Sequence, residues 1–103
     1  MKQKVYEFLQ TVPKGRVITY GQIAVAVFGD IRYSRAIGKI LHSNPNPSLY
    51  PCYKVVNASG KLSPAFAFGG IEMQKTLLEN DGIKVDADFT VDIKKYIYCD
   101  KSE

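Results

Sequence analysis

The most informative stretch of the chain reads Tyr50-Pro51-Cys52-Tyr53-Lys54-Val55-Val56. Its cysteine follows a proline directly and precedes a pair of β-branched residues. A turn-rich loop with two prolines, residues 43–48, leads into it. On the other side, a turn sequence at residues 57–60 separates two short apolar runs, which predicts a small β-hairpin over residues 55–62.

Three segments before the cysteine have helical periodicity. Apolar residues at helical spacing predict a short helix over residues 2–11. A second helix begins at Thr19, which forms a capping box with Gln22. Ser34 is the expected N-cap of a third helix, over residues 35–42.

The close pair of short helices determines the expected fold class. Two such helices joined by a tight glycine-containing turn match a helix-turn-helix. Beyond the cysteine, residues 71–80 form the clearest helix, and residues 85–98 are expected to add a short strand or turn. We therefore predict a mainly α, winged-helix-like, helix-turn-helix DNA-binding domain with a small β-hairpin.

The 103 residues suffice for one domain, which we expect to span residues 1–103 as a monomer, with residues 99–103 frayed. Net charge is unevenly distributed. Residues 1–54 hold eight basic and two acidic residues, a charge of +6, whereas residues 55–103 hold six basic and eight acidic residues, a charge of −2. A one-sided positive field favours a polyanion such as DNA.

Hydropathy and the number of cysteines argue against a membrane protein, a disulfide-bonded secreted protein and a zinc protein. No apolar run approaches the roughly 18 residues that span a bilayer, and no signal peptide is evident, so we expect a cytoplasmic protein without a membrane partner. A disulfide between Cys52 and Cys99 is not expected in that compartment. Two cysteines and one histidine without CxxC spacing argue against zinc, and no metal or cofactor is implied.

The order of these motifs resembles the active-site domain of the O6-alkylguanine-DNA alkyltransferase family, over about residues 3–85. Members transfer an alkyl group from a damaged guanine to their own cysteine. The family motif Pro-Cys-His-Arg-Val corresponds to residues 51–55 here, with Tyr53 in place of the histidine and Lys54 in place of the arginine. The residues 63–70 look like those of the short, non-enzymatic alkyltransferase-like proteins.

The resemblance implies catalytic roles for Cys52, Tyr53 and Asp81. In the family, the histidine activates the cysteine through a water, and an acidic residue at the position of Asp81 orients that histidine. Tyrosine, with a pKa near 10, is a poor base, although its hydroxyl can hold a water. Lys54 can favour the thiolate electrostatically. Without the resemblance, Cys52 would be interpreted as a small buried hydrophobe.

The resemblance also assigns a DNA interface. Arg35 matches the arginine that fills the gap left by an extruded nucleotide, and Tyr20 matches the tyrosine that helps to rotate the base out. Asn44 matches the asparagine that braces the hinge before the cysteine segment. The other residues expected at the DNA or around the base pocket are Ala36, Gly38, Lys39, Pro51, Lys54, Val55, Phe66 and Phe68. Which phenylalanine lines the pocket stays open, as does a purely structural role for both.

The sequence is compatible with three functions. The first is a repair protein that binds duplex DNA in the minor groove, flips O6-alkylguanine and transfers the alkyl group to Cys52. The second is a non-enzymatic lesion sensor that flags O6-alkylguanine for downstream repair proteins. The third is a helix-turn-helix regulator, which would require a sequence-specific operator. A separate pair of His42 with Cys52 has no motif behind it, and a solvated helix end is the expected role of His42.

Overall fold

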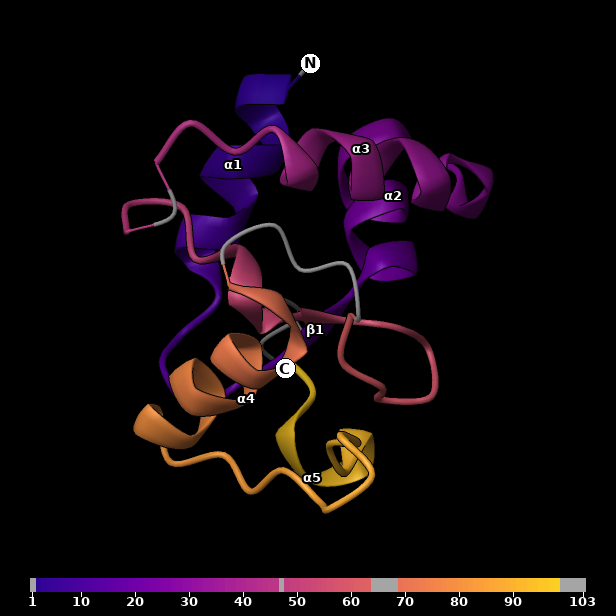
Figure 1. Ribbon diagram of the computed structural model, residues 1–103. Helices are drawn as coiled ribbons and strands as arrows, with labels where there is room; N and C mark the ends of the chain where they lie inside the picture. Colours follow the sequence, from indigo (N-terminus) through magenta and orange to yellow (C-terminus); the bar gives the residue numbers. More distant parts are fainter. Residues whose placement is uncertain (1, 47, 64–68, 99–103) are drawn as a thin grey trace.

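The computed structural model describes residues 2–46, 48–63 and 69–98, and Figure 1 shows their arrangement. In chain order the elements are α1 (Lys2–Thr11), β1 (Ile18–Thr19), α2 (Tyr20–Phe28), the 3₁₀ helix η1 (Ile31–Tyr33), α3 (Ser34–His42), the 3₁₀ helix η2 (Cys52–Lys54), β2 (Val55–Val56), α4 (Gly70–Asn80) and α5 (Ile93–Tyr96). The mainly helical fold class with a small sheet is confirmed.

The sheet does not form the way the sequence predicted. Val55 and Val56 pair in parallel with Ile18 and Thr19, not with the strand that follows them. The turn at residues 57–60 does form, and the Asn57 N–H donates to the Lys61 carbonyl at 3.1 Å. The chain after this turn forms an antiparallel bridge with residue 90 instead, so the hairpin prediction was wrong.

Two apolar clusters lie on opposite faces of this sheet. Because successive side chains of a strand point to opposite faces, Ile18 and Val55 join the cluster formed with α1, α2 and α3, whereas Val17 and Val56 join the cluster formed with α4. Cys52 belongs to the first cluster. Figure 1 accordingly shows α2 and α3 at one end of the molecule and α4 and α5 at the other.

The starts of α2 and α3 differ in how well they were predicted. The capping box is confirmed, because the Thr19 hydroxyl accepts from the Gln22 N–H at 3.1 Å and the Gln22 carboxamide accepts from the Thr19 N–H at 2.9 Å. Ser34, however, is not the N-cap of α3. It is the first helical residue, and its hydroxyl donates to the Ile31 carbonyl at 2.6 Å. The physical reason is that Asp30 already caps η1, which runs directly into α3.

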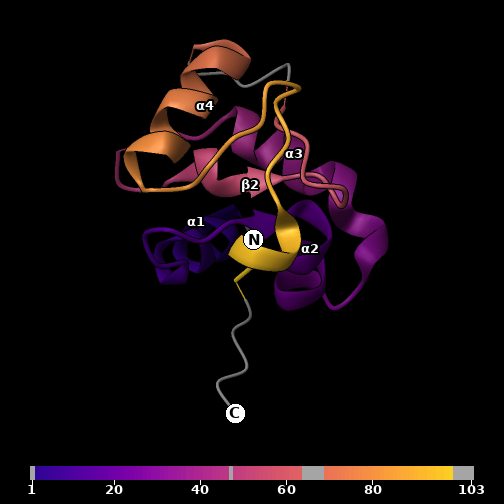
Figure 2. The same cartoon turned by 90° about the horizontal axis from the view of Figure 1, so that it is seen from below.

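The carboxyl-terminal segment forms a helix, α5, rather than the expected strand or turn alone. From the end of α5 the backbone pairs with Val17, the residue before β1: the Val17 N–H donates to the Tyr96 carbonyl at 2.9 Å, and the Tyr98 N–H donates to the Val17 carbonyl at 2.7 Å. The Gln22 carboxamide donates to the Tyr98 carbonyl at 2.8 Å. Figure 2 shows this segment beside α2. The expected frayed tail, residues 99–103, lies outside the described residues.

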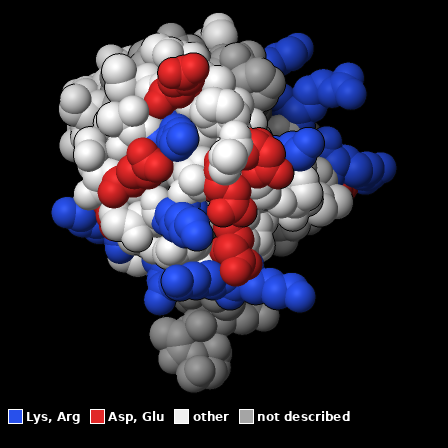
Figure 3. All heavy atoms as spheres, turned by 60° about the horizontal axis from the view of Figure 1, so that its bottom comes forward, with Lys and Arg blue, Asp and Glu red and all other residues white. Residues whose placement is uncertain are grey.

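Acidic side chains are found at the end of the molecule formed by the second half of the chain. The view that brings the α4 and α5 end forward shows acidic side chains gathered among basic ones (Figure 3). Among the exposed acidic residues of the described ranges, Glu7 belongs to the first half of the chain, and the second half contributes Glu72, Glu79, Asp86, Asp88 and Asp92. None of the helices in the described parts of the chain is long and apolar enough to cross a bilayer.

Candidate functional site around Cys52

The Cys52 thiol is free and buried, with 6% of the residue exposed. It begins η2, directly after the half-buried Pro51, and its N–H donates to the Tyr50 carbonyl at 2.7 Å. Burial raises the pKa of Cys52, and the nearby Asn44 amide only partly offsets this shift. At neutral pH the site therefore holds a thiol rather than a thiolate.

Tyr53, the residue that follows Cys52 in the chain, makes a hydrogen bond to Asp81. The Tyr53 hydroxyl donates to Oδ2 of Asp81 at 2.7 Å, although the two residues are far apart in the sequence. Burial raises the pKa of Tyr53, and the hydrogen bond and charge of Asp81 raise it further. The phenol is therefore a proton donor to Asp81 and a weak base, and its oxygen can still accept a hydrogen bond from a water.

Lys54 is buried at 6% exposure, and its ammonium group donates to the Val12 carbonyl at 2.7 Å. This carbonyl directly follows α1, where a cation is favoured by the helix dipole. Burial lowers the pKa of Lys54, and the charge of Asp81 opposes that shift. The ammonium nitrogen also lies 6.0 Å from the centre of the Tyr53 ring. Lys54 thus ties the cysteine segment to the end of α1, and its effect on the thiolate stays a prediction.

Asn44 connects the end of α3 to the cysteine segment. Its buried carboxamide donates to the Tyr50 carbonyl at 2.8 Å and accepts from the Asn46 N–H at 2.9 Å. The same Tyr50 carbonyl accepts from the Cys52 N–H. This geometry suits the hinge role that the sequence predicts.

Gln74 was not singled out as a site residue, yet it holds the cysteine segment in place. The side chain, 1% exposed, donates to the carbonyls of Tyr53 and Val55 at 3.0 Å each. It also accepts from the Ser63 N–H at 2.9 Å. The signal in the sequence was a polar residue at an inward position of α4, which normally requires buried hydrogen-bond partners.

The face of α3 expected to meet DNA is open. Arg35, Lys39 and His42 are exposed, as expected for a helix face that meets solvent or a partner. A Cβ atom built on Gly38 would meet nothing within 4 Å, so packing inside the protein does not require this glycine. With the half-buried Ala36, it leaves room for a close approach of a partner to the helix.

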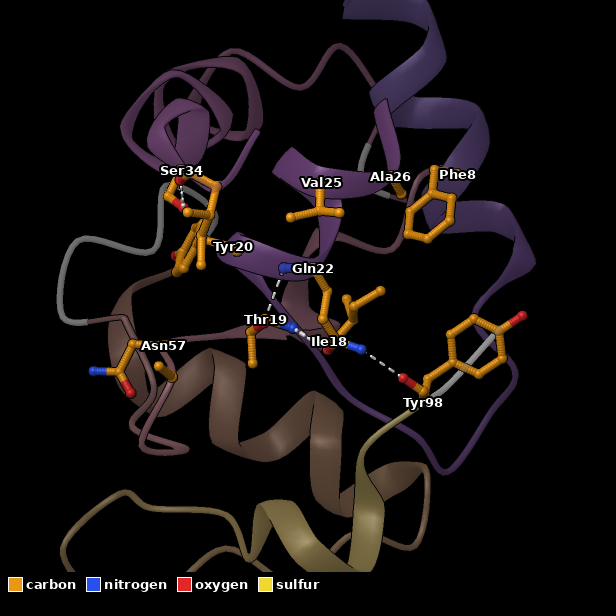
Figure 4. Close-up of a pocket in the computed structure, with 13 residues that line it drawn as sticks. Phe8, Ile18, Thr19, Tyr20, Gln22, Val25, Ala26, Ser34, Asn57 and Tyr98 are labelled. Atoms are coloured by element: carbon orange, nitrogen blue, oxygen red, sulfur yellow. Dashed lines mark hydrogen bonds between the residues drawn. The ribbon is translucent and has the colours of Figure 1, made fainter. Parts of the chain in front are cut away.

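Tyr20, the first residue of α2, is half-buried, and burial and the charge of Cys52 raise its pKa. It lines an apolar groove of about 690 Å³. In Figure 4, Tyr20, Ser34 and Asn57 lie at one end of this groove, and Phe8 and Tyr98 lie at the other. Cys52 does not line the groove, so the groove is an approach along α2 and not the thiol pocket.

Of the remaining residues expected at the base pocket, the structure describes Val55 but not Phe66 and Phe68. Val55 is buried in β2 and faces the helical cluster. Phe66 and Phe68 lie outside the described residues. Within the described ranges, no three His, Cys, Asp or Glu side chains gather as a metal site would require.

The comparisons with known proteins agree on one family. The family model described as 6-O-methylguanine DNA methyltransferase, DNA binding domain, matches residues 1–83. A DNA base-flipping protein of Vibrio parahaemolyticus is 34% identical over 93 residues, which cover 90% of each chain. A bifunctional methyltransferase/endonuclease of Picrophilus torridus is 38% identical over 92 residues, which cover 89% of this chain but only 30% of the relative.

The solved structures that are similar to this chain support the same family. S. pombe Atl1, in complex with damaged DNA containing O6-carboxymethylguanine, superposes with a TM-score of 0.85 at 27% identity, covering 95% of this chain and 94% of that one. The Mycobacterium tuberculosis protein OGT in complex with DNA superposes with a TM-score of 0.70 at 35% identity, covering 78% of this chain and 48% of that one. The chain therefore spans about half of the mycobacterial protein and nearly all of Atl1.

Proposed function

Because the chain belongs to the 6-O-methylguanine DNA methyltransferase family, we propose that it docks α3 on duplex DNA, extrudes an O6-alkylguanine and accepts the alkyl group on Cys52. The observation that carries this proposal is the 2.7 Å hydrogen bond between Tyr53 and Asp81, directly after the cysteine. It joins a carboxylate to the hydroxyl of the residue that follows the nucleophile in the chain.

The described surface suits the docking step. An O6-alkyl group cannot be reached while its base is stacked, so the nucleotide must leave the helix. The exposed Arg35 can stack in the gap, while Ala36 and Gly38 allow α3 to lie close to the minor groove. Tyr20 stands at the start of the neighbouring helix, where it can crowd the phosphate of the rotated nucleotide. Minor-groove docking provides little sequence readout, which suits a search for lesions.

The transfer step needs one proton acceptor. As the sulfur–carbon bond forms and the bond between the alkyl carbon and O6 breaks, the thiol proton must leave. We assign it to a water held by the Tyr53 oxygen; the water gives a proton to that oxygen as Tyr53 passes its own proton to Asp81, so Asp81 ends the step protonated. The guanine leaves as an anion, takes a proton at N1 from solvent water and regains its carbonyl. The alkylated thioether is stable, so each protein molecule reacts once.

The raised pKa of Cys52 predicts a strongly pH-dependent transfer. A free cysteine is roughly 3% thiolate at pH 7, and burial lowers that fraction further. Because deprotonation becomes easier as pH rises, the single-turnover rate on an O6-methylguanine duplex should increase about tenfold per pH unit between about pH 7 and 9. Binding to the same duplex, measured in parallel, serves as the control for DNA docking. A flat rate profile would contradict a thiolate-limited reaction.

The same pKa shifts favour one alternative, a lesion sensor. With the pKa of Cys52 and that of Tyr53 both raised, the site can bind an extruded alkylguanine without reacting. The extensive superposition on Atl1 with its damaged DNA supports this alternative too. Downstream repair proteins would then be required as partners.

The deciding experiment is intact-protein mass spectrometry after incubation with a duplex that carries O6-methylguanine. We expect the chain to gain the mass of one methyl group in exchange for a hydrogen, and a Cys52→Ala variant to gain nothing while still binding the duplex. Tight binding without any adduct in the parent chain would reject the transfer and establish the sensor.

Replacing Arg35 with alanine should weaken binding to the lesion duplex by about 10- to 100-fold, since stacking of a side chain on bases contributes about 1–3 kcal/mol. Folding should be unaffected because Arg35 is exposed on α3 and alanine is the better helix former. Fluorescence anisotropy and thermal unfolding would measure the two effects. Arg35→Lys retains the charge but not the planar group, so it separates stacking from electrostatics. Loss of the folded state in Arg35→Ala would contradict an exposed finger.

A further inference from the structure

We infer that Tyr6 is a positioning residue for the transfer, because one buried side chain on α1 contacts both the end of α3 and the segment that carries Cys52. Its hydroxyl donates to the Ile40 carbonyl, in the last turn of α3, at 2.8 Å. Its ring stacks on the ring of Tyr50, with centroids 5.0 Å apart and planes 16° from parallel. The inference rests on the proposed function, since it concerns how the thiol meets an extruded guanine.

Tyr50 transmits this contact to the thiol. Its carbonyl accepts from the Cys52 N–H at 2.7 Å and from the Asn44 carboxamide at 2.8 Å. Tyr6 therefore holds the ring of a residue whose backbone holds Cys52. Burial raises the pKa of the Tyr6 phenol, and the charge of the nearby Cys52 raises it further.

The consequence is a fixed relation between the DNA-docking helix and the nucleophile. The place where an extruded base arrives is set by the docking of α3, whereas the place of the sulfur is set by residues 50–52. Asn44 links the two along the chain, and Tyr6 links them through space. Since a misplacement of about 1 Å can reduce a rate about 10²-fold, a small shift at this link should affect transfer far more than DNA binding.

Tyr6→Phe tests this role with a single atom. The ring remains to stack on Tyr50, and the Ile40 carbonyl still accepts from the Ser43 N–H at 3.1 Å, so no buried carbonyl is left without a partner. We expect transfer to the variant to be about tenfold slower, with unchanged affinity for the lesion duplex and an unchanged unfolding temperature. A transfer rate equal to that of the parent would overturn the inference. So would a loss of affinity or stability that accounts for the slower rate.

Tyr96→Phe is the matched control. Its hydroxyl also makes one hydrogen bond, accepting from the Lys84 N–H at 3.2 Å, but the residue packs against the cluster on the other face of the sheet. Transfer should be unchanged in this variant. Tyr50→Leu, which removes the stack but leaves the Tyr6 hydroxyl, should slow transfer like Tyr6→Phe.

A second readout separates this inference from the proposed alkyl transfer. A duplex can carry a guanine whose O6 bears a two-carbon thiol tether, activated as a mixed disulfide with a small thiol. The Cys52 sulfur attacks the tether sulfur and releases the small thiol, so the exchange reports its position without breaking the carbon–oxygen bond. Cys99→Ser leaves Cys52 as the only thiol of the chain.

The two readouts have different meanings. Exchange that is about tenfold slower in Tyr6→Phe supports the positioning role even if the parent chain shows no methyl transfer, in which case only the proposed enzyme function fails. Exchange that is equally fast in parent and variant overturns the positioning role whether or not methyl transfer occurs.

Discussion

Replacing Tyr53 with histidine is expected to raise the rate of methyl transfer to Cys52 by about 10²-fold at pH 7, the lower end of what a positioned general base contributes. The phenol has a raised pKa because it is buried and bonded to Asp81. An imidazole at the same position has an ordinary pKa near 6.5 and can accept the thiol proton. We expect Asp81, which accepts from the Tyr53 hydroxyl, to accept the other N–H of the imidazole. Single-turnover transfer from an O6-methylguanine duplex measures the change.

Two further variants identify the part played by the hydroxyl. Tyr53→Phe removes the hydrogen bond to Asp81 and the site at which a water is held, and should slow transfer relative to the parent. Asp81→Asn in the Tyr53→His background should reduce the gain, since it removes the acceptor that orients the imidazole. If Tyr53→His transfers no faster than the parent, Tyr53 does not limit the reaction, and the relay that we assign to it is wrong.

The second large effect is on stability. Gln74→Leu should lower the free energy of unfolding by about 3–5 kcal/mol, because two carbonyls and one N–H lose their partner in the interior, at about 1–3 kcal/mol each. The side chain is 1% exposed and bonds to Tyr53, Val55 and Ser63. Since domains of this size are stable by only about 5–15 kcal/mol, the variant should unfold at a clearly lower denaturant concentration.

Gln10→Leu provides the control, because the same substitution is made at an exposed position of α1. It should change the free energy of unfolding by less than about 0.5 kcal/mol. Equal midpoints for the two variants in urea unfolding would mean that the cysteine segment does not depend on the carboxamide of Gln74.

The features that the sequence predicted correctly depend on residues that lie close together along the chain. The capping box of Thr19 and Gln22 involves residues three apart, and the structure confirms it. Helices predicted over residues 2–11 and 71–80 are found at Lys2–Thr11 and Gly70–Asn80 for the same reason. The catalytic and DNA-contacting roles had another source, the resemblance to a family, and they remain proposals.

What could not be predicted depends on partners far away in the sequence. The turn at residues 57–60 indicated a hairpin, but Val55 and Val56 pair with a strand that lies before the helix-turn-helix. Tyr6 looked like one more residue of an amphipathic helix, and only its contacts with Ile40 and Tyr50 give it a candidate role. Asp81 was expected next to Tyr53 from the family pattern, and the structure supplies the hydrogen bond.

The parallel pairing of β1 with β2 closes the chain into a loop. Residues 20–54 leave the sheet at Thr19 and return to it at Val55, so the loop contains α2, α3 and the cysteine segment. Opening this strand pair frees both ends of the loop at once. The loop is also held by α1 and the residue after it, through Tyr6 and Lys54, and by the second half of the chain, through Gln74 and Tyr98. The part of the protein that meets DNA and the part that would accept the alkyl group thus form one topological unit.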